Sequence, residues 1–496
     1  MTIKKIFRES IWIYVFVFLS AIAGYLLRVT YARNFTVREY GMFYAVYGFI
    51  FLFRPLREFG LGASQMFHMN KSLTKNEYAK AKGIFVVSIV SQVLLSVIVA
   101  VGIFMFRNYL AQNFFKDEIA VDIIDVILIY FIIHAVFYNL SNVFGSFQKH
   151  FLFQLRDPVS IIAIFLFSLL FLNLGFSTLT MPLAHVFSGI LALLIYWIFY
   201  KTSLKELNLK AHYSYDTIKE VFTYAFAMSI GSLAWVILSY LHTTLITWIK
   251  GVESVGYYNI VTPSVQIIFL LTNPVINLIF PIATNFFNRD MKSSLSALIS
   301  LIYNNFLILT LPAASIFFIY STKIIIFIFG AKYAIASPAL KIYLLFWIFI
   351  FLRQVNLVFL ASMGEAKFST RILWVEVLFN VFAAIIMIWL FDYTGAVIAG
   401  GIGAVLITFL TFNFLKKKIA VKIDYTQQLK TLLCGIIFTI TAVILERKIF
   451  LTIGKFSVVA EGLCVLSLSG IVYIFSLIVL KVVTREKILY VKKMIF

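Results

Sequence analysis

The segment TVREYGMFYAV, residues 36–46, has a counterpart in GVESVGYYNIV, residues 251–261, with Gly41 aligned to Gly256 at an offset of 215 positions. Two further matches follow in the same order, and these pair Pro55 with Pro274 (offset 219) and Lys149 with Lys367 (offset 218). Three ordered matches with a nearly constant offset indicate an internal duplication of the chain.

The composition around this repeat is that of a multi-span membrane protein. Of the 496 residues, 62% are hydrophobic and only 13% are charged, and the mean hydropathy is +0.99. Soluble domains average about 45–50% apolar and about 25% charged residues. The net charge of +21 could suggest a nucleic-acid partner, but the basic residues fall in short loops between apolar segments, which indicates membrane orientation instead. No nucleic-acid partner is therefore expected.

A helix needs about 20 apolar residues to cross the hydrocarbon core of a bilayer. The sequence therefore predicts an all-α polytopic membrane protein with about fourteen transmembrane helices. The predicted spans are 10–32, 42–67, 83–106, 119–145, 158–175, 180–200, 220–249, 256–286, 298–320, 338–361, 370–391, 394–415, 428–446 and 459–481. The first of them lacks a small-residue cleavage site and is expected to be retained.

The distribution of basic residues predicts the orientation. If the N-terminus is cytoplasmic, about 27 of the Lys and Arg residues fall on the cytoplasmic side and about 10 on the outer side. This bias predicts that both termini are cytoplasmic and that the chain is a multi-pass protein of the cell membrane.

The duplication covers six predicted helices in each copy. It predicts an N-terminal six-helix lobe at 1–210, a C-terminal six-helix lobe at 211–420 and two additional helices at 421–496. Because six is even, both copies enter the membrane from the same side, which makes the repeat parallel. Transporters built in this way bind substrate between the lobes, near the middle of the membrane.

Three charged residues, Arg54, Arg57 and Glu58, lie near the middle of the predicted span 42–67. A charge at that depth costs about 3 kcal/mol on insertion scales, so it is seldom found without a function. Arg54 and Glu58 are four residues apart and can pair on one helix face. The surplus of positive charge favours a water-filled, anion-attracting cavity, and a structural network with a neighbouring helix is the alternative.

Further candidates are placed by depth and by residue type. Arg28 and Arg353 are the other cationic candidates for the cavity, although Arg28 is near enough to the interface to extend into it. Candidates for a counter-ion or for coupling to an ion gradient are Glu58, Asp125 and Glu376, of which Asp125 can instead lie at the solvated outer end.

The prolines inside the apolar runs are candidate hinges, because proline removes a backbone donor and bends a helix. These are Pro55, Pro274 and Pro281. The alternative is that they are simple kinks.

Several function classes lack their signatures. The chain has no P-loop, no pattern typical of a metal site and no recognisable Ser/His/Asp arrangement, so no catalytic residue, metal or cofactor is predicted. No loop exceeds about twenty residues, which disfavours an enzyme that polymerises glycans at the outer face. The chain is therefore not expected to be an enzyme.

Several segments in order along the chain resemble the polysaccharide flippases, a family of the multidrug/oligosaccharidyl-lipid/polysaccharide exporter superfamily. These segments are YARNFTVREYGMF, REFGLGASQMF, KGVESVGYYNIV, FGAKYAIASPALKIYLLFWI and ASMGEAKFSTR. The resemblance implies two six-helix bundles and alternating access coupled to an ion gradient or to the membrane potential. It also implies that cationic side chains of the first two helices line the central cavity. The arginines on these two predicted helices, at a matching depth, are Arg28, Arg54 and Arg57.

The leading hypothesis is therefore a flippase that carries a polyprenyl-diphosphate-linked oligosaccharide unit, such as an O-antigen unit, from the cytoplasmic to the outer leaflet. Guanidinium groups suit this substrate because they donate paired hydrogen bonds to phosphate. The expected partners are that lipid-linked glycan, membrane lipids and the machinery of polysaccharide polymerisation and chain length. The coupling ion would be H⁺ or Na⁺. An ion-coupled multidrug extruder of the same superfamily and a membrane-embedded glycan polymerase are the alternatives.

Overall fold

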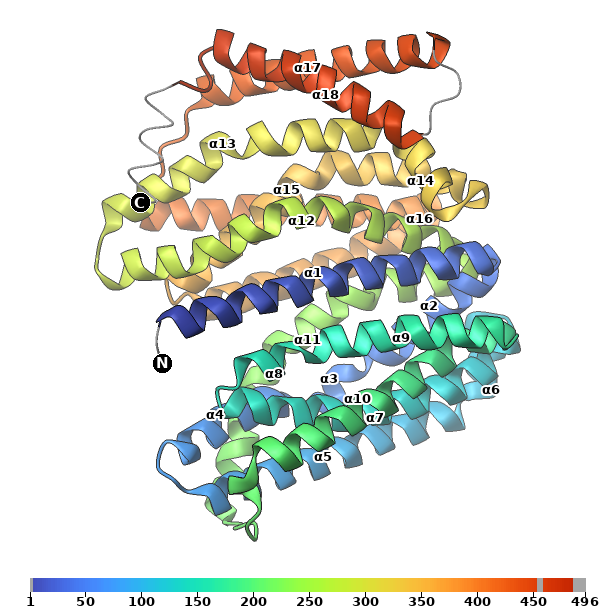
Figure 1. Ribbon diagram of the computed structural model, residues 1–496, viewed down its shortest axis with the longest axis vertical. Helices are drawn as coiled ribbons and strands as arrows, with labels where there is room; N and C mark the ends of the chain where they lie inside the picture. The colour runs from blue at the N-terminus through green and yellow to red at the C-terminus, as the bar shows by residue number, and fades with distance from the viewer. Residues whose placement is uncertain (1–2, 453–457, 485–496) are drawn as a thin grey trace. The chain divides into compact units, whose positions relative to one another are not determined.

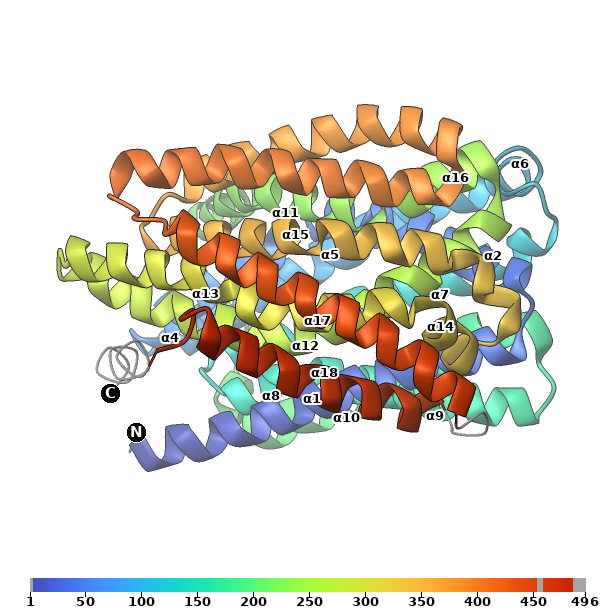
Figure 2. The same ribbon diagram turned by 90° about the horizontal axis from the view of Figure 1, so that it is seen from above.

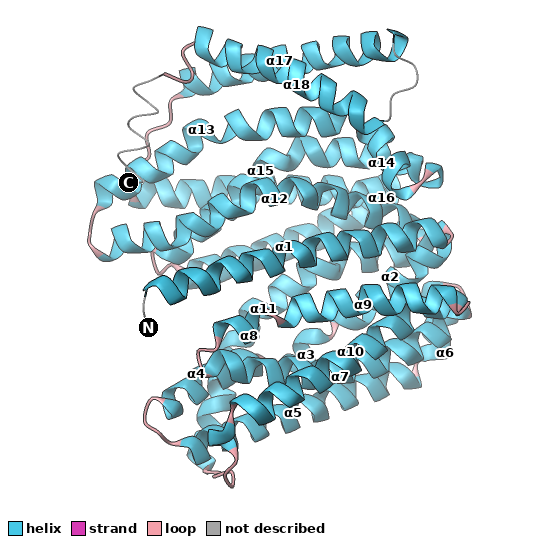
Figure 3. Ribbon diagram, in the orientation of Figure 1, coloured by secondary structure: helices cyan, strands magenta, loops and turns pink. Residues whose placement is uncertain are grey.

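The computed structural model describes the backbone of residues 3–452 and 458–484, and the side chains of residues 15–16, 18–265, 276, 278–448 and 460–484. Helices and the loops between them make up this described part, which contains no β-strand (Figure 3). The predicted all-α fold is confirmed.

Eleven helices in the described part are long and apolar enough to cross a membrane. Each of them overlaps one of the predicted spans. The remaining three predicted spans behave differently: 10–32 and 256–286 include side chains outside the described set, and 42–67 is divided into shorter helices. The sequence pattern therefore located the spans well, but it did not show that the second one is broken.

The chain divides into two compact units, residues 1–259 and 260–496, and the long helix α12 (Val252–Asn288) runs across the division. The first unit takes in α11 because this helix packs against α2 and α4. The repeat, and the lobes at 1–210, 211–420 and 421–496 that it predicts, stay a prediction.

The first unit contains the following helices (Figure 1): α1 (Ile3–Asn34), α2 (Val37–Leu52), α3 (Arg54–Glu58), α4 (Leu61–Leu73), α5 (Tyr78–Met105), α6 (Arg107–Tyr109), α7 (Ile119–Ser146), α8 (His150–Gln154), α9 (Arg156–Asn173), α10 (Thr180–Ser203) and α11 (Tyr215–Lys250). Helix α7 is central to this unit, since it packs against α2, α4, α5 and α10. Its buried side chains, such as Phe137 and Phe144, join an apolar core with Leu61 and Tyr196. Helix α7 can therefore fix side chains that reach it from several directions.

The second unit contains, after α12, the helices α13 (Lys292–Ile319), α14 (Ser321–Phe329), α15 (Ser337–Ser362), α16 (Ala366–Lys418), α17 (Tyr425–Thr452) and α18 (Val458–Val479). Asp392 interrupts α16 with a non-helical backbone (φ 57°, ψ −148°), so the two spans predicted at 370–391 and 394–415 are both present. Helices α17 and α18 lie side by side (Figure 2), and α17 packs against α13.

The two glycines that mark the repeat, Gly41 and Gly256, lie at one close crossing of α2 and α12. A Cβ atom on Gly41 would lie 1.9 Å from the carbonyl oxygen of Val252, and one on Gly256 would lie 2.4 Å from that of Val37. Both positions therefore require glycine for the same reason, which is the approach of a neighbouring backbone. Equivalent positions of two repeats are expected to meet in this way if a symmetry axis passes between them.

Candidate functional site

The three charged residues predicted at mid-membrane lie on a short helix, α3, which is separated from its neighbours at both ends. Helix α2 ends at Leu52, and Phe53 turns the chain into α3. At the other end Phe59 and Gly60 both adopt the left-handed conformation, with φ of 43° and 70°. A Cβ atom on Gly60 would lie 2.0 Å from the carbonyl oxygen of Ala225 in α11, so only glycine fits there.

Pro55 lies in the first turn of α3. At that position its missing N–H has no helical partner to lose, so proline starts the short helix and does not break a longer one. The discontinuity comes from Phe53 and from the Phe59–Gly60 pair. Pro281 lies in α12, which continues through it, and the side chain of Pro274 lies outside the described residues. The hinge role of the three prolines stays a prediction.

Arg57 is completely buried in the first unit. Its guanidinium donates one hydrogen bond to the carbonyl oxygen of Phe131 and another to Nδ1 of His134, at 2.6 Å. It also lies over the Phe131 ring, 4.2 Å from the ring centre. Because a guanidinium only donates, His134 accepts at Nδ1, which is the neutral tautomer with its proton on Nε2. Arg57 thus ties α3 to α7.

Arg54 remains partly open. Its Nε lies 2.6 Å from Oε1 of Glu58, and the two side chains are 27% and 25% exposed. The predicted pairing of these two residues across one helical turn is confirmed. The Arg54 guanidinium also lies 5.1 Å from the ring centre of Tyr138 in α7. Glu58 lies 3.9 Å from Arg57 as well, so a single carboxylate serves two arginines.

A third arginine, Arg156, meets the same tyrosine. It is the first residue of α9, directly after the break that follows α8, and lies 4.4 Å from the ring centre of Tyr138. Its Nε lies 3.6 Å from a carboxylate oxygen of Asp157, and one of its terminal nitrogens donates to the side-chain oxygen of Asn142 at 3.4 Å. The Tyr138 hydroxyl donates to Asp157 at 3.2 Å, which closes the group.

We give the name arginine row to the three arginines that meet α7, namely Arg57, Arg54 and Arg156. Their partners on α7 are Phe131, His134, Tyr138 and Asn142, whose spacing of three or four residues places them along one helix face. Three guanidiniums here meet two carboxylates, Glu58 and Asp157, so the row carries a net positive charge. Its two partly exposed arginines, Arg54 and Arg156, can hold an oxyanion by charge-assisted hydrogen bonds.

Sequence reasoning missed Arg156, Asp157 and Tyr138. The predicted spans 119–145 and 158–175 leave Arg156 in the connection between them, whereas in the structure it is the first residue of α9. A signal was nevertheless present, since the chain reads FRP at 53–55 and RDP at 156–158. In both places an arginine and a proline open a helix inside an otherwise apolar stretch.

Two predicted residues of the first unit lie apart from the row. The Arg28 guanidinium lies 5.0 Å from the ring centre of Tyr44 and donates to the carbonyl oxygen of Asn259 at 3.4 Å. Asp125 lies 3.5 Å from Nε of Arg107 near the opposite end of α7. Their roles in binding and coupling stay predictions.

In the second unit, Arg353 of α15 and Glu376 of α16 form an ion pair with a direct hydrogen bond. Their side chains are only 15% and 3% exposed. The structure therefore pairs two residues that were predicted separately, one for substrate binding and one for coupling. Within this pair the charges balance, which leaves no excess cation.

The fold and the arginine row together define the class of the protein. It is a multi-pass, all-helical membrane protein with a net cationic row of side chains that α3 and α9 place against α7. The polysaccharide biosynthesis protein family matches residues 6–287, which is more than half of the chain, and the chain belongs to this family.

Relatives and solved structures support the same class. An uncharacterized membrane protein of Methanocaldococcus jannaschii, MJ1068, is 25% identical over 485 residues, which cover 94% of this chain and 96% of that protein. A probable low-salt glycan biosynthesis flippase of Haloferax volcanii, Agl15, is 23% identical over 229 residues, 46% of this chain and 47% of that one. The chain is thus similar to a protein described as a glycan flippase.

The fold is similar to that of the lipid II flippase MurJ in an inward closed conformation, with a TM-score of 0.75, 15% identity and coverage of 94% of this chain and 98% of that one. It is also similar to an inward-facing multidrug resistance transporter of the MATE family in the MOP superfamily, with a TM-score of 0.58, 14% identity and coverage of 80% and 98%. The resemblance to the polysaccharide flippases is confirmed, and the chain has a flippase-type transporter fold.

Proposed function

We propose that the chain is a flippase that moves a polyprenyl-diphosphate-linked oligosaccharide from the cytoplasmic to the outer leaflet of the cell membrane, by alternating access and with both termini in the cytoplasm. The observation that carries this proposal is the surplus of guanidinium groups in the arginine row, two of which stay partly exposed. A lipid diphosphate needs a cationic path for its head, while its polyprenyl chain can stay in lipid.

Charge also favours the proposed direction. With the cytoplasm negative, outward movement of one negative charge gains about 2.3 kcal/mol per 100 mV. Arg54 and Arg156 would bind the diphosphate, and Tyr138, which both of them contact, would hold their guanidiniums in place. Glu58 and Asp157 would keep the row from binding the diphosphate too tightly for release. Coupling to H⁺ or Na⁺ through Glu58, Asp125 or Glu376 is part of the proposal.

The experiment measures flipping of a labelled polyprenyl-diphosphate oligosaccharide in proteoliposomes, with an external glycosidase reporting the accessible fraction. Arg54→Gln and Arg156→Gln each remove a charge-assisted contact of about 1.5–3 kcal/mol, so each should lower the initial rate by about tenfold or more. Arg38→Gln is the matched control, because Arg38 also pairs with a carboxylate, that of Asp117 at 2.8 Å, but lies outside the row. Unchanged rates in both row variants would refute the site.

The likeness to a multidrug resistance transporter of the MATE family favours a second candidate, an ion-coupled extruder of small molecules. An extruder of cations would need an uncompensated carboxylate, whereas each carboxylate of the row has an arginine within 4 Å. The same proteoliposomes decide between the two. Uptake of a cationic dye without flipping of the lipid-linked oligosaccharide would favour the extruder.

A further inference from the structure

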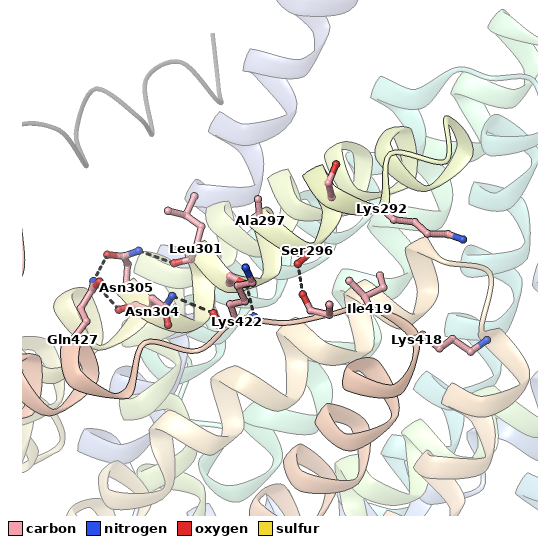
Figure 4. A pocket seen from close by; sticks show the side chains of 13 residues that line it. Lys292, Ser296, Ala297, Leu301, Asn304, Asn305, Lys418, Ile419, Lys422 and Gln427 are labelled. Carbon is pink, nitrogen blue, oxygen red and sulfur yellow. Dashed lines mark hydrogen bonds between the residues drawn. The ribbon is translucent and has the colours of Figure 1, made fainter.

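A pocket of about 740 Å³ lies in the second unit, where α13 begins and α16 ends (Figure 4). It involves none of the residues of the arginine row and none that the proposed function uses. One wall is the N-terminal half of α13, and the other is the segment 419–424, which links α16 to α17. We call this segment the linker.

The linker is held against α13 through its main chain. Ser296 donates to the carbonyl oxygen of Ala420, Ser300 accepts from the backbone N–H of Lys422 at 3.0 Å, and Asn304 accepts from that of Asp424 at 2.9 Å. The three α13 residues are four positions apart and so lie on one helix face. Because these bonds fix the linker backbone, the pocket is formed before any ligand arrives.

The charged side chains that line the pocket are all cationic: Lys292, Lys418 and Lys422. Lys292 lies 3.5 Å from Asp290, but both side chains are largely exposed, which makes this pair weak. Lys418 pairs with Glu365. The ion pairs found among described residues do not include Lys422. A soluble or lipid anion can therefore gain contacts here that the protein itself does not make.

Helix α17 begins beside the pocket, and its buried residue Gln427 lines the pocket. Leu429, Leu433, Ile436 and Ile440 are all exposed and recur every three or four residues, which places them on one side of the helix. Helix α17 is apolar enough to cross a membrane, so this face is suited to lipid chains. This apolar face lies on the side of α17 opposite to Gln427, so lipid surrounds a helix whose first turn borders the cationic pocket. The pocket can therefore hold the anionic head of a lipid in that surrounding layer.

We propose that this pocket binds the phosphate headgroup of an anionic phospholipid, whose acyl chains extend into the surrounding membrane. Basic pockets between transmembrane helices at the cytoplasmic side commonly hold anionic headgroups, because that leaflet is rich in negative lipids. The abundance of basic residues at this end, with Lys416, Lys417 and Lys418 in the last turn of α16, agrees with a cytoplasmic position.

The test uses the full-length protein in nanodiscs of phosphatidylcholine with a small fraction of phosphatidylglycerol, and measures by native mass spectrometry which lipid stays bound. The parent protein should be enriched in phosphatidylglycerol. Lys422→Gln should lower this enrichment by about fivefold, and Lys292→Gln with Lys422→Gln by about twentyfold. Neither substitution removes the backbone hydrogen bonds of the linker.

Lys417→Gln is the matched control, since it removes the same charge from a neighbouring residue that does not line the pocket. Equal enrichment in the double variant and the parent, or an equal loss in Lys417→Gln, would overturn the proposal. Excess inorganic phosphate should leave the bound lipid in place. Displacement by phosphate would assign the pocket to a soluble anion and would also overturn it.

Discussion

Arginine is used differently in the two units of this chain. In the first unit, the arginine row sets three guanidiniums against two carboxylates, and Arg54 and Arg156 stay partly exposed. In the second, Arg353 meets one carboxylate, that of Glu376, and the pair is almost closed to solvent. A balanced and closed pair serves the fold, whereas an unbalanced and open row can still bind an anion.

The repeat sharpens this comparison. Where the first copy carries Arg54 and Glu58, the second carries Asn273 and Asn277, whose side chains lie outside the described residues. If both copies descend from one ancestor, the charged row is specific to the first. The family match, which covers residues 6–287, includes every residue of the row.

The largest effect is expected at the closed pair. Arg353→Met leaves the Glu376 carboxylate buried without a cation, which should lower the free energy of unfolding by about 3–5 kcal/mol. Arg353→Met combined with Glu376→Leu removes both charges and should recover most of this loss, to within about 1 kcal/mol of the parent. Unfolding in mixed detergent and SDS micelles measures both values. A double variant as unstable as the single one would show that the pair does more than balance charge.

The next effect is expected inside the row, where burial separates Arg57 from Arg54. Arg57→Met leaves the Phe131 carbonyl and His134 Nδ1 without a donor, which should cost about 2–3 kcal/mol of stability. Arg54→Met, at a partly exposed ion pair, should cost less than about 1 kcal/mol and yet slow flipping as Arg54→Gln does. Equal losses of stability in the two variants would contradict the distinction drawn here, in which Arg57 anchors α3 to α7 and Arg54 binds the anion.

This distinction also marks the limit of what the sequence predicts. Hydropathy located eleven of the spans, because these depend on composition along the chain. The depth of Arg54, Arg57 and Glu58 in the membrane stays a prediction. Hydropathy did not reveal that Arg57 faces α7 or that Arg156 joins the row. Those facts depend on the left-handed turn at Phe59 and Gly60 and on the break before α9, which re-aim side chains without changing the composition.

The smallest effect is expected at Tyr138, the residue that Arg54 and Arg156 share. Tyr138→Phe removes the hydroxyl that donates to Asp157 but keeps the ring under both guanidiniums, so it should cost less than about 1 kcal/mol and slow flipping only about twofold. Tyr138→Leu also removes the cation–π contacts, worth about 1–2 kcal/mol, and should slow flipping by about fivefold or more. The initial rates in proteoliposomes measure both.

The contrast between these two substitutions tests how the row works. If the ring positions the guanidiniums, the rate should follow the presence of the aromatic ring, with the phenylalanine variant close to the parent. If the hydroxyl matters more, because its hydrogen bond fixes the Asp157 carboxylate beside Arg156, phenylalanine and leucine should slow flipping equally. The second result would show that the carboxylates, and not the aromatic ring on α7, position the guanidiniums of the row. The row of the first unit would then resemble the Arg353–Glu376 pair of the second unit, in which a carboxylate holds the arginine.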